Sequence, residues 1–198
     1  RVEAFALVRE ASRRTLRLDP FDQQIIAGLA MADGKIAELP TGEGKTLAAV
    51  FPAFLHALTG LGVHVLTFND YLARRDAAWM GPIYELLGVT VGCIQEGQTA
   101  AEKRAAYARD VTYATAKEVG FDYLRDQLAG QAEDVVLRPF FLALVDEADS
   151  ILIDEARIPL VISGLSQAEA PDAGLVARSV ERLAPGTDFQ TDEARTSV

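Results

Sequence analysis

One stretch decides the fold of this chain, Glu38-Leu39-Pro40-Thr41-Gly42-Glu43-Gly44-Lys45-Thr46. Two glycines flank a single residue, and a lysine and a threonine follow at once. Small residues allow backbone N–H groups to turn toward anionic oxygens, so a loop of this kind can surround a phosphate. Lys45 would then reach the outer phosphates of a nucleotide, and the hydroxyl of Thr46 would bind Mg²⁺. A helix that begins near Lys45 would add the partial positive charge of its N-terminus.

The stretch departs from the full phosphate-loop pattern at one position. That pattern has a further glycine where Leu39 stands, so the motif is the shorter Thr-Gly-x-Gly-Lys-Thr form. A glycine-rich turn before a helix is the alternative interpretation, and a Gly-Lys-Thr tripeptide between a strand and a helix argues against it. We therefore predict phosphate binding by Thr41, Gly42, Glu43, Gly44, Lys45 and Thr46.

The composition limits the classes to which the protein can belong. Its 198 residues suit a single compact domain with a substantial core, and 49% of them are hydrophobic. The formal net charge of −10 argues against non-specific nucleic-acid binding, because such binding requires cations that neutralise phosphates. The single cysteine, Cys93, excludes an internal disulfide and is interpreted as a small buried side chain. The chain begins at Arg1 without a signal-peptide pattern, and we expect a fragment of a longer protein.

The hydrophobic pattern alternates between helix and strand periods along most of the chain. Helices are predicted over residues 3–18, 21–32, 45–58, 70–87, 99–109 and 116–127. Strands are predicted over residues 35–39, 63–68, 89–94, 111–113 and 140–145. Buried apolar strands that alternate with helices indicate an α/β fold, with a parallel sheet covered by helices on both faces. Residues 46–69 contain no charged side chain, but a glycine turn divides them, and we predict a buried helix and strand rather than a membrane span.

Two carboxylates follow the last predicted strand, in Asp146-Glu147-Ala148-Asp149. In an enzyme with a phosphate loop, Asp146 would hold Mg²⁺ and Glu147 would polarise the water that attacks the γ-phosphate. The alternative is an acidic cap that stabilises the N-terminus of a following helix. In company with the phosphate loop, the pair predicts hydrolysis of a nucleoside triphosphate, with Lys45, Asp146 and Glu147 as catalytic residues and Thr46 and Asp146 as metal ligands.

Two similar tripeptides rank below this acidic pair. Asp154-Glu155-Ala156 follows the first pair without room for a chain reversal, and Asp192-Glu193-Ala194 has no predicted strand before it. His56 and His64 have no neighbouring metal ligands in the sequence and are interpreted as packing or surface residues.

Four parts of the sequence carry a resemblance to a known family: residues 41–46, 63–67 with 69–76, 120–126 and 149–157. In these stretches the sequence resembles the SecA family, the ATPase motors of bacterial preprotein export. It implies a RecA-like P-loop NTPase fold for residues 1–164, as the first nucleotide-binding domain of a two-domain motor. Residues 165–198 would then form a linker and the shortened start of the family's preprotein-crosslinking domain. Within them, residues 166–174 indicate a linker, 175–183 a short helix and 188–198 a weak strand.

The resemblance also implies ligands, partners and further site residues. Phe21 and Gln24 match the family's adenine-side motif, and a glutamine amide can both donate to and accept from an adenine edge. ATP and Mg²⁺ are the implied ligands. The Sec translocon channel, an unfolded preprotein and a second RecA-like domain are the implied partners, and nucleic acid is not among them. The full-length protein is expected in the cytoplasm, bound peripherally to the inner membrane. Asp19 departs from the family, which has an arginine beside the adenine pocket.

Two functions therefore compete. The first is a protein-translocating ATPase that couples ATP hydrolysis to preprotein export. The alternative is a DEAD-box-like RNA or DNA helicase, because Asp146-Glu147-Ala148-Asp149 is the signature of that class; a nucleotide-binding adaptor without turnover is a third reading. The acidic net charge and residues 120–126 favour the first. Motors of this class bind nucleotide between two RecA-like domains, so we expect this chain alone to bind nucleotide weakly and hydrolyse it poorly.

Overall fold

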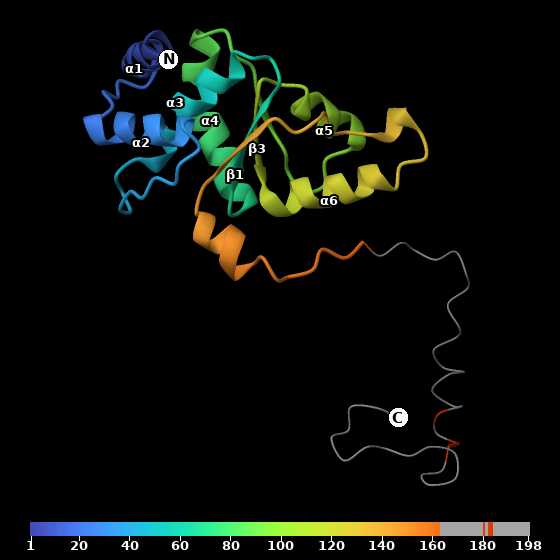
Figure 1. Cartoon of the computed structure of the whole chain (residues 1–198). Coiled ribbons are helices and arrows are strands. Elements are labelled where there is room, and N and C mark those ends of the chain that lie inside the picture. The colour runs from blue at the N-terminus through green and yellow to red at the C-terminus, as the bar shows by residue number, and fades with distance from the viewer. Residues whose placement is uncertain (163–179, 181, 184–198) are drawn as a thin grey trace. The chain divides into compact units, whose positions relative to one another are not determined.

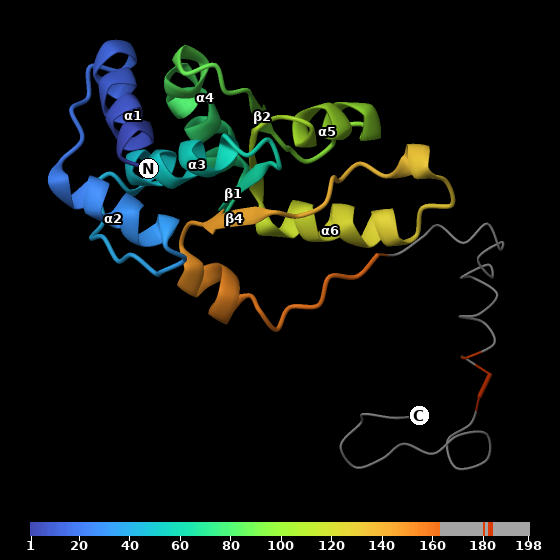
Figure 2. The same cartoon turned by 45° about the horizontal axis from the view of Figure 1, so that its top comes forward.

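A parallel sheet of four strands organises the protein (Figures 1 and 2). The computed structural model describes residues 1–162, 180 and 182–183. The strands, in the spatial order β2-β3-β1-β4, are β1 (Val63–Thr67), β2 (Val91–Cys93), β3 (Val111–Thr115) and β4 (Leu142–Val145). Every pairing is parallel, and Val63 at the start of β1 lies opposite both Val111 and Leu142. The predicted α/β class is confirmed.

Helices cover both faces of this sheet, as the sequence predicts (Figures 1 and 2). They are α1 (Val2–Thr15), α2 (Asp22–Ala32), α3 (Lys45–Ala57), α4 (Asp70–Leu86), α5 (Ala100–Tyr107) and α6 (Ala116–Gln127), with a short 3₁₀ turn at Ala132–Asp134 and a π-helical turn at Ser150–Asp154. α3 and α4 pack on one face with α1 outside them, and α5 and α6 pack on the other. α2 packs on α3, where Gly28 allows close approach: a Cβ there would lie 3.0 Å from the Cβ of Phe51.

The alternation of side chains along the central strands produces two cores. Val63 and Val65 point to the face covered by α3 and α4, whereas Ala114 on β3 joins Tyr107 and Val119 beneath α5 and α6. The strands are apolar on both faces because helices cover both. Cys93 is half-buried against the first core, and burial raises the pKa of its thiol to about 11, which keeps it protonated at neutral pH.

Side-chain caps fix where several helices begin. The Asn69 side chain accepts a hydrogen bond from the Leu72 amide at 2.9 Å, and the hydroxyls of Thr99 and Thr115 accept from amides in the first turns of α5 and α6. Each cap satisfies a backbone N–H that has no partner within its helix. The predicted start of α4 after Asn69 and the predicted bounds of α6 are therefore confirmed, and the other predicted helices differ by a few residues at their ends.

The strand predicted over residues 35–39 is wrong. These residues have no regular structure, and the side chain of Ile36 is 92% exposed. In the part of the chain that the structure describes, β4 pairs only with β1, so no strand lies beside residues 35–39 to complete their hydrogen bonds. A strand needs a partner as well as a suitable pattern.

The apolar stretch at residues 46–69 forms α3, a turn with Gly60 and Gly62 at positive φ, and β1, as predicted. Among the described residues, no helix combines the length and the apolar character needed to cross a membrane. The linker, helix and strand predicted over residues 166–174, 175–183 and 188–198 lie outside the described residues, apart from 180 and 182–183. Residues 1–162 form one compact unit.

Gly92 on β2 leaves no room for a side chain, because the backbone of α5 lies directly beside it. A Cβ at this position would lie 2.3 Å from the carbonyl oxygen of Ala106 on α5, and a backbone atom cannot move aside cheaply. We expect Gly92→Ala to lower the free energy of unfolding by about 1–3 kcal/mol, measured by urea denaturation. Gly130→Ala is the matched control, because no atom lies within 4 Å of the added carbon. The control should stay within about 0.5 kcal/mol of wild type. Equal stability of the two variants would contradict the prediction.

His64 on β1 is buried between Tyr107 and Phe140, and its Nε2 atom has no hydrogen-bond partner among the described residues. Burial, assisted by the positive charge of Arg138, lowers the pKa of His64, and a backbone hydrogen bond at Leu142 opposes this. The unfolded chain, in which the histidine pKa is about 6.5, therefore takes up this proton at a higher pH than the folded chain does.

Protonation of His64 should consequently destabilise the protein. The contribution that neutral His64 makes to the free energy of unfolding is fully present above about pH 6.5. It is lost as the pH falls toward the lower pKa of His64 in the folded chain. We expect the free energy of unfolding, measured at a series of pH values, to decline less steeply between about pH 7.5 and 5.5 in His64→Phe than in wild type. Gly130→Ala retains both histidines and should keep the wild-type slope. Identical slopes for wild type and His64→Phe would refute this assignment.

Candidate functional site

The predicted phosphate loop enters α3 through two glycines in left-handed conformations. Gly42 has a φ of 89° and Gly44, which caps α3, has a φ of 75°. No side chain of a described residue accepts a hydrogen bond from the first turn of α3. The amides of Leu47 and Ala48 donate to the Gly44 carbonyl, whereas those of Lys45 and Thr46 have no partner among the described residues. These two amides remain available to an anion, and the helix dipole adds to the attraction. Lys45 and Thr46 follow immediately and are half-buried.

Gln24 on α2 is joined directly to this loop. Its side-chain Nε2 donates to the carbonyl oxygen of Glu43 at 2.9 Å, and its Oε1 accepts from the amide of Phe21 at 3.0 Å. A Cβ on Gly44 would lie 2.2 Å from that Nε2, so a side chain there would displace the Gln24 amide, and the φ of 75° itself favours glycine. The side chain of Gln24 is buried, whereas that of Phe21 is 68% exposed. The structure thus brings the predicted adenine-side residues to the predicted phosphate loop.

Asp19 stands near this region but is paired elsewhere. Its carboxylate accepts from the Nε of Arg9 on α1 at 3.0 Å. Both side chains are about half exposed, so the pair contributes little to stability.

The predicted acidic pair follows β4 at the carboxyl end of the sheet. The amide of Asp146 donates to the Leu66 carbonyl at 2.8 Å, which extends the pairing of β4 with β1 by one bond. Asp146 Oδ1 accepts from the Glu147 amide at 3.0 Å. Glu147 is exposed and has a φ of 52°, a left-handed conformation that is uncommon for residues other than glycine. Strained backbone of this kind concentrates at functional sites.

The loop and the acidic pair are linked through the fold rather than by direct contact. α3, which begins at Lys45, contacts β4, which ends at Val145. Within the described residues, no hydrogen bond or ion pair joins residues 41–46 to Asp146 or Glu147.

The predicted metal ligands are few in number. No group of three or more His, Cys, Asp or Glu side chains suited to a metal occurs in the described part of the chain. Mg²⁺ beside a nucleotide normally takes only one or two protein ligands, with phosphates and waters completing its shell. A Thr46 hydroxyl and an Asp146 carboxylate are oxygen donors of the required kind, so these residues fit a nucleotide-bound Mg²⁺.

Asp76 is a site neighbour that sequence reasoning missed. It lies on the buried face of α4, and its Oδ1 accepts from the Nε of Arg75 at 2.8 Å. Burial raises the pKa of Asp76, Arg75 opposes that rise, and the negative charge of Asp146 adds to it. The charge of Asp146 therefore acts on Asp76, although it is the smallest of these influences. The available signal was a carboxylate on the apolar face of a predicted helix, three residues after Ala73.

Comparisons with known proteins agree with this geometry. A family model described as the SecA DEAD-like domain matches residues 1–195. The protein translocase subunit SecA of Rubrobacter xylanophilus is 56% identical over 196 residues, which cover 99% of this chain and 22% of the relative. The corresponding protein of Carboxydothermus hydrogenoformans is 55% identical with the same coverage. The chain thus spans about a fifth of the length of the curated relatives it matches.

A solved structure shares the fold at low sequence identity. It is described as a hypothetical ATP-dependent RNA helicase from Sulfolobus tokodaii, and it matches with a TM-score of 0.56 and 21% identity over 76% of this chain and 43% of that one. This likeness concerns the RecA-like fold alone. The sequence matches decide the family, because they cover almost the whole chain at more than half identity. The chain belongs to the SecA family, in which it corresponds to the DEAD-like domain.

Proposed function

We propose that this chain is the ATP-binding domain of a SecA-type motor, which couples ATP hydrolysis to the export of unfolded preproteins through the Sec translocon. The observation that carries the proposal is the glycine loop at the start of α3, tied to Gln24 on one side and connected through α3 to the strand that ends at the acidic pair. A base, a phosphate chain and an attacking water each have residues of suitable chemistry in this arrangement.

The phosphate chain is assigned to the loop. Backbone amides of Thr41, Gly42 and Gly44, with those of Lys45 and Thr46 at the start of α3, supply hydrogen-bond donors, and Lys45 adds a positive charge. The Glu43 amide, which donates to the Pro40 carbonyl at 3.2 Å, would join them only if the loop rearranged around the phosphates. Thr46 and Asp146 would hold Mg²⁺, whose contribution when bound is to neutralise charge on the phosphates. Glu147 accepts a proton from the attacking water, either directly or through one intervening water molecule. The exposed position of Glu147 leaves its carboxylate accessible to such a water.

The base is assigned to Phe21 and Gln24. The exposed ring of Phe21 offers an apolar surface, and the amide of Gln24 offers one donor and one acceptor. Both polar atoms of Gln24 are used by the protein itself, by the Phe21 amide and the Glu43 carbonyl. Adenine recognition would therefore share or replace the bond to Glu43, which makes the loop responsive to the base.

The partners and the location follow from the relatives, whose printed name is protein translocase subunit SecA. We infer that the full-length protein works in the cytoplasm at the inner-membrane translocon, with a second RecA-like domain that completes the nucleotide cleft. Residues 1–164 would be the first nucleotide-binding domain, and residues 165–198 would begin the preprotein-crosslinking domain. The helicase alternative has weaker support, because the chain carries a net charge of −10 and its relatives bear translocase names.

The function can be tested in a chimera in which this chain replaces the matching segment of the Rubrobacter xylanophilus relative. Glu147→Gln should retain ATP binding and lower ATP turnover by about a hundredfold or more, because the water loses its proton acceptor. Glu85→Gln, an exposed change on α4, is the control and should keep wild-type turnover. Turnover of the unsubstituted chimera should rise with translocon vesicles and unfolded preprotein. Stimulation by RNA instead would support the helicase.

Base recognition can be tested in the chain itself by fluorescence anisotropy with labelled ATP and GTP. Gln24→Ala should weaken ATP binding by about 5- to 30-fold, as expected for a lost hydrogen bond of the nucleotide site, and should weaken GTP binding much less. Lys45→Ala should weaken both nucleotides, because the phosphates are common to them. An equal loss for ATP and GTP in Gln24→Ala would mean that Gln24 only supports the loop.

A further inference from the structure

A groove runs along α6 to the carboxyl ends of β1 and β3, apart from the proposed nucleotide site. It consists of two adjoining cavities, one of about 540 Å³ beside Phe121 and one of about 310 Å³ beside Thr67. Glu96, Lys117 and Glu118 line both cavities, so the two lie side by side, and together they are called the α6 groove below. Parallel α/β folds bind their ligands beyond these strand ends. Residues 41–46 line neither cavity.

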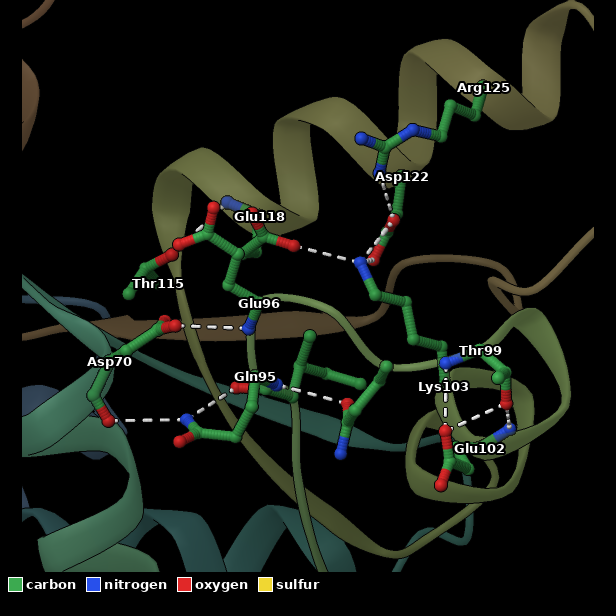
Figure 3. A network of polar contacts seen from close by, with 12 residues as sticks. Asp70, Gln95, Glu96, Thr99, Glu102, Lys103, Thr115, Glu118, Asp122 and Arg125 are labelled. Atoms are coloured by element: carbon green, nitrogen blue, oxygen red, sulfur yellow. Dashed lines mark hydrogen bonds and ion pairs between the residues drawn. The ribbon is translucent and has the colours of Figure 1, made fainter.

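The α6 groove is built on a buried ionic cluster (Figure 3). The Nζ of Lys103 on α5 lies 2.8 Å from Glu118 and 2.8 and 3.0 Å from the two carboxylate oxygens of Asp122, both on α6. Tyr107 and Arg125 each donate to Asp122 at 2.9 Å. The side chains of Lys103 and Asp122 are only 7% and 2% exposed. Removing one partner would leave a buried charge, so the cluster holds α5 and α6 in place and neutralises its own charges.

A second carboxylate fixes the far end of the groove. Asp126, at the end of α6, accepts hydrogen bonds from the amides of Val136 at 3.0 Å and Leu137 at 2.9 Å. This contact holds the segment after the 3₁₀ turn against α6, and Val136 from that segment lines the larger cavity together with Asp134, the last residue of the turn. The walls of the groove are therefore held in place by hydrogen bonds within the protein.

The charges that the cluster leaves uncompensated are mostly negative. Glu96 and Asp134 line the larger cavity, and Asp70 and Glu155 line the smaller one. None of these four carboxylates forms an ion pair with a residue that the structure describes. Lys117 opposes them with a single positive charge. A phosphate-bearing ligand would be repelled by this surface, and a cationic one would be attracted.

The groove also has apolar surface. The ring of Phe121 lies between two cations, with its centroid 5.9 Å from Lys117 Nζ and 5.6 Å from the guanidinium carbon of Arg125, and Phe68 and Ile151 line the smaller cavity. An occupant must therefore combine positive charge with apolar side chains. We propose that the α6 groove binds a basic, apolar segment of an unfolded polypeptide. The choice of a polypeptide rests on the proposed function, whereas the charge and apolar requirements come from the groove itself.

The proposal is tested with the 198-residue chain and three fluorescent probes measured by anisotropy. The probes are a short unstructured peptide of Lys, Leu and Ser, the same peptide with Glu for every Lys, and a single-stranded RNA. Glu96→Gln combined with Asp134→Asn removes two negative charges whose side chains make no hydrogen bond to the described residues. Glu3→Gln combined with Glu85→Gln removes two exposed charges away from the groove and is the matched control. Thermal melts check that all variants fold.

We expect the basic peptide to bind wild type more tightly than the acidic peptide and the RNA. The groove variant should weaken the basic peptide by about three- to tenfold, as for two partly exposed charge contacts, and the control should weaken it far less. Added salt should reduce the difference between the variants. Equal binding of the basic and acidic peptides, preference for RNA, or equal losses in both variants would overturn the proposal. ATP affinity, measured in parallel, separates this failure from a failure of the proposed function.

Discussion

The parallel pairing of β1 with β3 and β4 is the constraint on which the rest of the structure depends. Parallel neighbours cannot be joined by a tight turn, so each connection crosses a face of the sheet and a helix covers that face. The same pairing places every strand's carboxyl end at one edge. Asp146, Thr67 and Thr115 meet there although they are far apart in the sequence, and both the acidic pair and the α6 groove are built at that edge.

Local chemistry explains what the sequence could predict. The α4 and α6 helices begin where a side chain caps them, at Asn69 and Thr115. Such caps can be predicted from the sequence without knowledge of the tertiary structure. Residues 35–39 have a pattern compatible with a strand, yet they have no partner strand in the described part of the chain. Pairing is a property of two segments, so a single segment cannot reveal it.

The candidate site likewise contains features that the sequence predicts and contacts that only folding creates. The glycine loop and the acidic pair are contiguous motifs whose chemistry requires particular residue types at fixed spacing, and residue order alone identifies them. The contact of Gln24 with the Glu43 carbonyl, the burial of Asp76 near Asp146, and the closing of the groove by Asp126 each join segments brought together only by folding. Family resemblance indicated Gln24 as a site residue but not the bond that it makes.

Gly28 has a consequence for the spacing of the residues in the proposed nucleotide site. The absence of a side chain there lets α2 lie against Phe51 and Ala48 of α3. α2 contains Gln24 and is capped by Phe21, while α3 begins at the glycine loop, so this contact and the bond from Gln24 to Glu43 set the distance between the proposed base-binding residues and the loop. A larger residue at position 28 would move the two helices apart while leaving every proposed functional group intact. The spacing within the proposed site thus depends on a residue that lies outside it.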